Sequence, residues 1–198
     1  MWAWPWLGVL AAALHAGAVI GFGAALEGYS QVLHPAALLG ARGFPHAGAF
    51  NLLAFVLPGL LMAAVALRLR ARLPATTGWS GRIGGQLVLL AALGFALQGL
   101  LPLDPDDLDN AASGLHAVAW MLWWVAFVPG ALALASAWKR AGARGLARFT
   151  TVLALLLLAL VLVGVELLPP GAAQRLASGL WLLWGTLAAW RSGRVRAA

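Results

Sequence analysis

Acidic residues are rare in this chain, and most of them stand together in the stretch LPLDPDDLDNAASGLH, which runs from Leu101 to His116. The stretch holds four of the six acidic residues, namely Asp104, Asp106, Asp107 and Asp109. Clustered carboxylates are ligands for Ca²⁺, and carboxylates combined with histidine are ligands for Zn²⁺. These residue types suggest two hypotheses, a calcium site and a zinc site. Each kind of site requires its ligands at a particular spacing.

The spacing excludes a calcium loop of the EF-hand type. Loop positions 5, 6 and 12, counted from the first aspartate, would have to be an oxygen ligand, a glycine and a glutamate. They are instead Leu108, Asp109 and Leu115. A looser divalent-ion site stays open. For most of the aspartates we favour a loop that leads into a helix, because Asn110 or Ser113 can cap a helix and acids suit its N-terminus.

A zinc site would make this region catalytic, because Zn²⁺ lowers the pKa of a bound water and so activates it as a nucleophile. The available ligands are His34, His46, His116 and Asp104. No HExxH motif or similarly tight spacing joins them. A zinc-dependent intramembrane hydrolase of a lipid ester or amide is therefore kept as the alternative function, and the favoured interpretation has no cofactor.

The composition is that of an integral membrane protein. The chain has 198 residues, of which 63% are hydrophobic and 10% charged, and its mean hydropathy is +0.89. Soluble domains carry roughly 25% charged residues. The absence of cysteine excludes disulfides and thiolate chemistry. The net charge of +7 comes from arginines beside apolar runs, which fits membrane topology better than nucleic-acid binding.

Six apolar runs predict the elements that position these residues. They cover residues 3–26, 48–69, 84–103, 114–138, 150–168 and 173–191. Each is long enough to cross a bilayer core of about 30 Å. In lipid the backbone must bond internally, so we expect helices. The predicted fold is an all-α bundle of six transmembrane helices that forms a single domain over residues 1–198.

The basic residues predict an orientation. Eleven of the 13 follow the second, fourth and sixth runs, and they are Arg68, Arg70, Arg72, Arg82, Lys139, Arg140, Arg144, Arg148, Arg191, Arg194 and Arg196. Cytoplasmic loops carry an excess of such residues. We therefore expect both termini in the cytoplasm, the aspartates outside, and a multi-pass protein of the bacterial inner membrane.

Polar residues inside a bilayer are costly and often functional. In the predicted topology several of them reach the outer leaflet at similar depth, namely Asn51, Gln98, His116, Glu166 and Arg175. Trp120 shares a helix face with His116, and Trp123 and Phe127 continue that face. Each has a structural alternative: hydrogen bonds across helices for Asn51 and Gln98, an ion pair between Glu166 and Arg175, and ordinary core for the aromatic face.

Other residues carry structural predictions. His15 falls near mid-membrane, and a hydrogen bond to a backbone carbonyl is favoured over a proton carrier or haem ligand, because no histidine is matched to it in depth. Pro58 and Pro129 predict a kink or a packing irregularity in their helices. The small residues of GGQLVLLAALG, which begins at Gly84, suit close contact between helices.

The block from Tyr29 to Leu67 resembles a bacterial and archaeal membrane family labelled domain of unknown function 998. Matching positions in this block are Tyr29, Ser30, Leu39, Gly40, Ala41, Gly43, Pro45, His46, Asn51, Pro58, Gly59, Leu60 and Leu61. Two further blocks match at Leu101, Pro102, Asp104, Leu115 and His116, and at Gly171, Gln174, Arg175 and Leu176. Leu103 stands where the family has cysteine. The resemblance implies a six-helix bundle without an assigned activity, and it points to Asp104, His116 and Arg175.

The favoured function is that of a non-enzymatic membrane protein. It would bind, move or sense a lipid or other lipophilic molecule in the outer leaflet, with Asp104, His116 and Arg175 at a polar mouth. The guanidinium of Arg175 would meet a phosphate or carboxylate head group. No nucleic-acid partner is expected, and the oligomeric state is left open.

Overall fold

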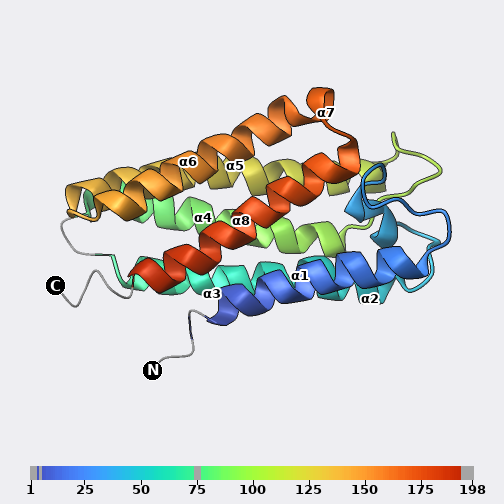
Figure 1. Cartoon of the computed structure of the whole chain (residues 1–198), viewed down its shortest axis with the longest axis horizontal. Coiled ribbons are helices and arrows are strands. Elements are labelled where there is room, and N and C mark those ends of the chain that lie inside the picture. The colour runs from blue at the N-terminus through green and yellow to red at the C-terminus, as the bar shows by residue number, and fades with distance from the viewer. Residues whose placement is uncertain (1–3, 5, 74–76, 193–198) are drawn as a thin grey trace.

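The computed structural model describes residues 4, 6–73 and 77–192, and within these residues it is all-helical (Figure 1). Five spans are long and apolar enough to cross a membrane. They are α1 (Trp6–Ala25); the continuous span of α2 (Ala47–Asn51), the π-helical η2 (Leu52–Val56) and α3 (Leu57–Ala71); α4 (Gly78–Leu100); α5 (Ala111–Arg140); and α6 (Arg144–Leu162). The chain is therefore that of a multi-pass membrane protein.

The sixth predicted run forms the long helix α8 (Pro170–Ser192), which follows the short α7 (Gly164–Leu167). Unlike the other long helices, α8 is not apolar enough to count as a span by composition. It carries Gln174, Arg175 and Ser178 in its first turns, and these side chains form hydrogen bonds within the protein. α8 packs against α1, α3 and α6.

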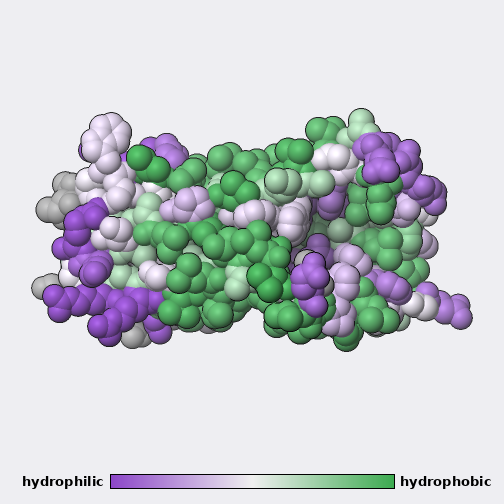
Figure 2. All heavy atoms as spheres, turned by 90° about the horizontal axis from the view of Figure 1, so that it is seen from above, coloured by the Kyte–Doolittle hydropathy of each residue, from purple (hydrophilic) through white to green (hydrophobic). Residues whose placement is uncertain are grey.

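Successive long helices run in opposite directions, so the chain has two distinct ends (Figure 1). The aspartate-rich end holds the loops 26–46 and 101–110 together with α7, and the short 3-10 helix η1 (Ala36–Gly40) lies in the first loop. The arginine-rich end holds the C-terminal ends of α3, α5 and α8 and the starts of α4 and α6. Figure 2 shows hydrophilic residues at both ends and an apolar band between them. The orientation in the membrane stays a prediction.

Several helices begin earlier than the apolar runs predict. α4 begins at Gly78 rather than residue 84, and α6 begins at Arg144 rather than residue 150. The predicted start of the first run includes residues 3 and 5, which lie outside the described residues. An apolar-run criterion stops at the first polar residue, whereas a helix continues into the interface, where arginine stems cover apolar surface and their charges stay in water.

The small residues of α4 allow its backbone to approach α5, as predicted. A Cβ atom on Gly84 would lie 2.8 Å from the carbonyl oxygen of Gly130, and one on Gly94 would lie 2.9 Å from the backbone nitrogen of Trp123. Both distances are too short for a side chain without movement of the backbone. The α4–α5 pair is the most extensive helix contact in the described part of the chain.

The irregularity predicted at Pro58 is confirmed, and it is the π-helical turn η2 just before it. Proline has no N–H, and its ring clashes with the carbonyl four residues earlier, here that of Ala54. A π-helical turn widens the backbone at that point. Pro129 differs, because α5 stays α-helical across it.

Candidate functional site

Arg175 binds the first loop of the aspartate-rich end to the start of α8. Its Nε donates to the side-chain oxygen of Gln31 at 3.0 Å, and its Nη2 donates to the hydroxyl of Tyr29 at 2.6 Å. Its Nη1 donates to the carbonyl oxygens of His34 at 2.9 Å and Gly171 at 2.8 Å. The guanidinium also lies 5.8 Å from the centre of the Tyr29 ring. These contacts fix the position of a half-buried cation.

No carboxylate neutralises this cation among the residues that the structure describes. The ion pair with Glu166, one of the two alternatives for these residues, is not formed, because Glu166 is exposed on α7 and no contact joins it to Arg175 although both are described. A guanidinium has five N–H donors. Four are used by Tyr29, Gln31, His34 and Gly171, which leaves one N–H on Nη2 for an acceptor from outside the described chain.

The loop can dock because the start of α8 is locally small. A Cβ atom on Gly171 would lie 2.7 Å from the carbonyl oxygen of Val32, so only glycine allows this approach. The backbone N–H of Ala172 donates to the same carbonyl at 3.0 Å. The side-chain oxygen of Gln174 accepts from the backbone N–H of Ala36 at 2.6 Å. Gly171, Gln174 and Arg175 thus form one docking site for the first loop.

Protonated Tyr29 completes this arrangement. Burial raises the pKa of its phenol above the ordinary value, and this effect exceeds the lowering by the charge and hydrogen bond of Arg175. The phenol therefore keeps its hydrogen near neutral pH. It accepts from Arg175 and donates toward the carbonyl oxygens of His34 and Pro35, at 3.3 and 3.1 Å.

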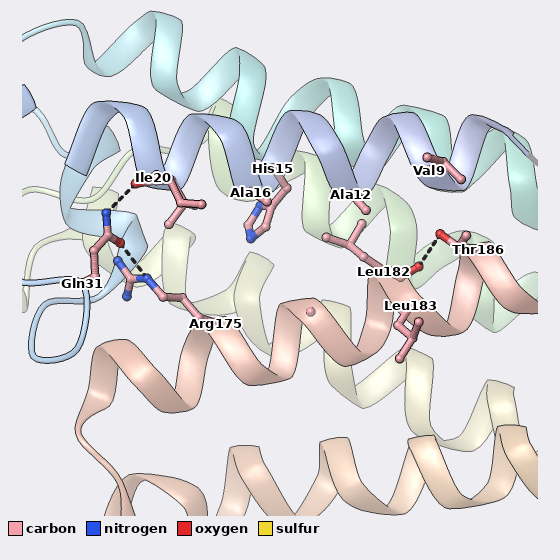
Figure 3. A pocket seen from close by; sticks show the side chains of 12 residues that line it. Val9, Ala12, His15, Ala16, Ile20, Gln31, Arg175, Leu182, Leu183 and Thr186 are labelled. Carbon is pink, nitrogen blue, oxygen red and sulfur yellow. Dashed lines mark hydrogen bonds between the residues drawn. The ribbon is translucent and has the colours of Figure 1, made fainter. Parts of the chain in front are cut away.

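Arg175 and Gln31 lie at one end of a cavity of about 520 Å³ between α1 and α8 (Figure 3). The remaining lining is mostly apolar and consists of Val9, Ala12, His15, Ala16, Val19, Ile20, Gly179, Leu182, Leu183 and Thr186. At 1.5 Å per residue, the stretch of α1 from Val9 to Ile20 is about 16 Å long. We call this feature the α1–α8 groove. It has a cation at one end and apolar walls along its length.

His15 lies midway along the groove and is held on both sides of its ring. Its Nδ1 lies 2.7 Å from the carbonyl oxygen of Ala54, and its Nε2 lies 3.0 Å from the hydroxyl of Ser178. Because a carbonyl oxygen only accepts, Nδ1 carries a hydrogen. In an α-helix the carbonyl oxygen of Ala54 would accept from the N–H four residues later, but that residue is Pro58, which has no N–H. The predicted bond of His15 to a backbone carbonyl is confirmed.

Asp104 organises the loop before α5. Its carboxylate accepts from the backbone N–H of Asp106 at 3.1 Å and from the side-chain nitrogen of Asn110 at 2.9 Å. Asn110 in turn caps α5 by accepting from the backbone N–H of Ser113 at 2.9 Å. The predicted capped helix is confirmed.

His116 is buried and is bonded to the same loop at a different point. Its Nδ1 lies 2.9 Å from the carbonyl oxygen of Leu101. No hydrogen bond or ion pair joins His116 to Asp104 or to Arg175, all of which the structure describes. The aromatic face below it is largely core, because Trp123 is buried and Trp120, which contacts Trp124 at a ring distance of 5.9 Å, is half-buried.

Asn51 and Gln98, the other predicted polar residues, are buried on neighbouring helices. The side-chain nitrogen of Asn51 donates to the carbonyl oxygen of Gly40 at 2.8 Å, which fastens α2 to the first loop. The side-chain nitrogen of Gln98 has no partner among the described residues. Neither residue lines the α1–α8 groove.

The four residues predicted as zinc ligands are not brought together. Nδ1 of His34 accepts from the backbone N–H of Ser30 at 3.0 Å, close to Tyr29. His46 is exposed and lines a different cavity, beside α1 and η2. Within the part of the chain that the structure describes, no three His, Cys, Asp or Glu residues could hold a metal ion between them.

The sequence indicated Arg175 but not the groove beside it. Tyr29 belongs to a block that carries the family resemblance, whereas nothing in the sequence marks Gln31, because it stands 144 positions from its partner. The walls of the groove come from the first and last helices, and most of their side chains are Ala, Val, Leu and Ile, which are common throughout the chain. A contact between helices from the two ends of the chain produces no recognisable pattern in the sequence of either helix.

One comparison with known proteins gives a match. The model of the family described as Protein of unknown function (DUF998) matches residues 9–191. No curated protein and no solved structure matches the chain.

Proposed function

The chain belongs to the DUF998 family of unknown function, and from the geometry of its site we propose that it binds a lipid or similar lipophilic molecule with an anionic head group in the α1–α8 groove. The aspartate-rich end would lie at the outer leaflet. One observation carries the proposal, namely a half-buried cation without a carboxylate partner at the end of an apolar groove.

The groove suits one acyl chain. Its length along α1, about 16 Å, is close to half of a bilayer core of about 30 Å. It is therefore as long as one leaflet is thick. Its walls offer Ala12, Val19 and Leu182 to an apolar chain. Ligand sites are usually concave, mostly apolar and furnished with a few polar groups that fix orientation, and the groove has this character.

The polar end suits a phosphate or carboxylate. Arginine keeps its charge at all physiological pH values, and a single N–H of a guanidinium can form a charge-assisted hydrogen bond with either group. Arg175 has one N–H left on Nη2, and Gln31 and Tyr29 hold the guanidinium in place. An ion pair with an anionic head group would supply the counter-charge that the described residues do not.

The test fills the groove without disturbing the fold. Gly179 lines the groove and has no atom within 4 Å of an added Cβ, so Gly179→Leu places a side chain in the space proposed for the acyl chain. Protein purified in mild detergent is extracted, and the retained lipids are measured by mass spectrometry. We expect wild type to retain about one lipid per chain, and Gly179→Leu to lose most of it.

The matched control is Gly21→Leu, which also adds a side chain in open space on α1 but lines a different cavity. It should retain lipid as wild type does. The second variant, Arg175→Gln, should lose anionic lipids selectively. Equal retention by Gly179→Leu and Gly21→Leu would refute the groove as the binding site.

A further inference from the structure

The arginine-rich end holds a second cavity, between the last turns of α5 and the first turns of α6. Its volume is about 700 Å³. Its lining combines three cations, Lys139, Arg144 and Arg148, with the hydroxyl side chains Ser136 and Thr151 and the apolar side chains Leu132, Ala135, Ala147 and Val152. We call it the α5–α6 basic cavity. It shares no residue with the α1–α8 groove.

Neighbouring arginines at this end are engaged within the protein. Arg72 lies over the ring of Trp4 at 4.7 Å, and Arg191 lies over the ring of Phe149 at 4.8 Å. Arg140 donates to the hydroxyl of Ser136 at 2.8 Å. These contacts spread their charges over aromatic faces and hydroxyl groups.

The three cations of the α5–α6 basic cavity have no such partner within the described residues, to which all three belong. All six acidic residues of the sequence stand at the opposite end of the bundle, in its loops and in α7. No acidic side chain of the chain is therefore placed to neutralise Lys139, Arg144 and Arg148. A cavity with three uncompensated cations calls for an anion from outside.

We infer that the α5–α6 basic cavity binds the head group of an anionic phospholipid from the leaflet at the arginine-rich end. Its phosphate would lie among Lys139, Arg144 and Arg148, since charge-assisted hydrogen bonds to phosphate are the strong ones. Basic pockets between transmembrane helices are known to take anionic head groups. The acyl chains would continue over the apolar side chains Leu132 and Val152, of which Val152 is 54% exposed.

The competing explanation is that these residues only set the orientation of the chain. An orientation signal depends on how many basic residues a side carries. A binding site depends on which residues carry the charge. Two triple variants with equal charge loss therefore separate the explanations: Lys139→Gln with Arg144→Gln and Arg148→Gln, and Arg68→Gln with Arg72→Gln and Arg191→Gln, none of which lines the cavity.

The measurement is native mass spectrometry of delipidated full-length protein in detergent, titrated with phosphatidylglycerol or with phosphatidylcholine. Wild type and the Arg68/Arg72/Arg191 variant should prefer phosphatidylglycerol. Each cation near an anionic surface contributes on the order of 1 kcal/mol, or about fivefold, so the cavity variant should lose at least about tenfold in affinity. Exchange of charge type, Lys139→Arg with Arg144→Lys and Arg148→Lys, should retain most of the preference.

Three results would overturn the inference. One is equal loss of phosphatidylglycerol in both triple variants, which would mean a diffuse charge effect. Another is the absence of a preference over phosphatidylcholine in wild type. The third is displacement of phosphatidylglycerol by an equal concentration of inorganic phosphate, which would make the cavity a site for free phosphate.

Discussion

Single polar residues inside this bundle fall into two groups. The side chains of Asp104, His116 and Asn51 form hydrogen bonds with residues of the loops at the aspartate-rich end, and they hold these loops in place. Arg175 is fastened as well, but its charge has no carboxylate partner in the described chain. The sequence indicated Arg175 by its type and depth, and it could not distinguish these groups, because the partners of a side chain are decided by the tertiary structure.

His15 offers a prediction about stability. His15→Phe keeps an aromatic ring but removes the N–H that donates to the carbonyl oxygen of Ala54. Pro58 cannot replace this donor, because proline has no N–H. Loss of a buried hydrogen bond costs about 1 kcal/mol, and hydrogen bonds between helices within membranes are worth about as much. We expect a lower thermal unfolding temperature in detergent for His15→Phe, and recovery of most of the loss in His15→Gln, which can donate again. Equal stability of all three proteins would contradict this role.

Arg175 offers a prediction that separates its two roles. Arg175→Lys keeps a positive charge but cannot form the four hydrogen bonds that hold Tyr29, Gln31, His34 and Gly171. We expect faster amide hydrogen exchange in residues 29–36 for Arg175→Lys and Arg175→Gln alike. Anionic lipid should be retained better by the lysine variant than by the glutamine variant. Unchanged exchange in both variants would show that the loop does not depend on Arg175.

Individual helices followed from the sequence with good accuracy, because runs of about 20 apolar residues have few alternatives in a membrane. Their ends did not, since α4 and α6 continue through polar residues at the interface. Pro58 predicted an irregularity in its helix, and the structure shows that this irregularity is a π-helical turn. The polar residues at the start of α8 were expected to begin a helix. The sequence did not predict that they also bind the first loop.

The α4–α5 contact gives a prediction at this scale. Gly84→Leu would place its side chain against the carbonyl of Gly130, at a backbone approach that leaves no space. Overpacking a tight core costs about 1–3 kcal/mol. We expect a lower unfolding temperature for Gly84→Leu than for the control Gly21→Leu, because a Cβ atom added at Gly21 has no atom within 4 Å. Equal destabilisation of the control would contradict this role of Gly84, because helix propensity favours leucine over glycine at both positions.

Considered as a whole, the molecule is polarised. Its acidic residues gather at one end and its basic residues mostly at the other. Figure 2 shows the two hydrophilic ends and the apolar band between them. The sequence predicted this asymmetry, because the charged residues of each loop can be counted without knowing how the helices pack. The sequence did not predict the α1–α8 groove. The groove forms where the first and last helices pack against each other, and no pattern within either helix predicts that contact.

The orientation can be tested directly, because the chain contains no cysteine. Single variants Asp107→Cys and Ala141→Cys place a thiol at the aspartate-rich and the arginine-rich end respectively. A membrane-impermeant maleimide should label Asp107→Cys in intact bacterial cells, and Ala141→Cys only after permeabilisation. The reverse pattern would place the groove's cation at the cytoplasmic leaflet and correct the predicted topology.

The central claim is that an acyl chain lies between α1 and α8, and photo-cross-linking tests it most directly. A phosphatidylglycerol with a diazirine in one acyl chain is irradiated with the protein, and the labelled peptides are mapped. The account predicts adducts on α1 between Val9 and Ile20 and on α8 between Gly179 and Leu183, which disappear in Gly179→Leu and persist in Gly21→Leu. Equal labelling of lipid-facing residues elsewhere, such as Leu155 and Leu156 on α6, with no effect of Gly179→Leu, would contradict it.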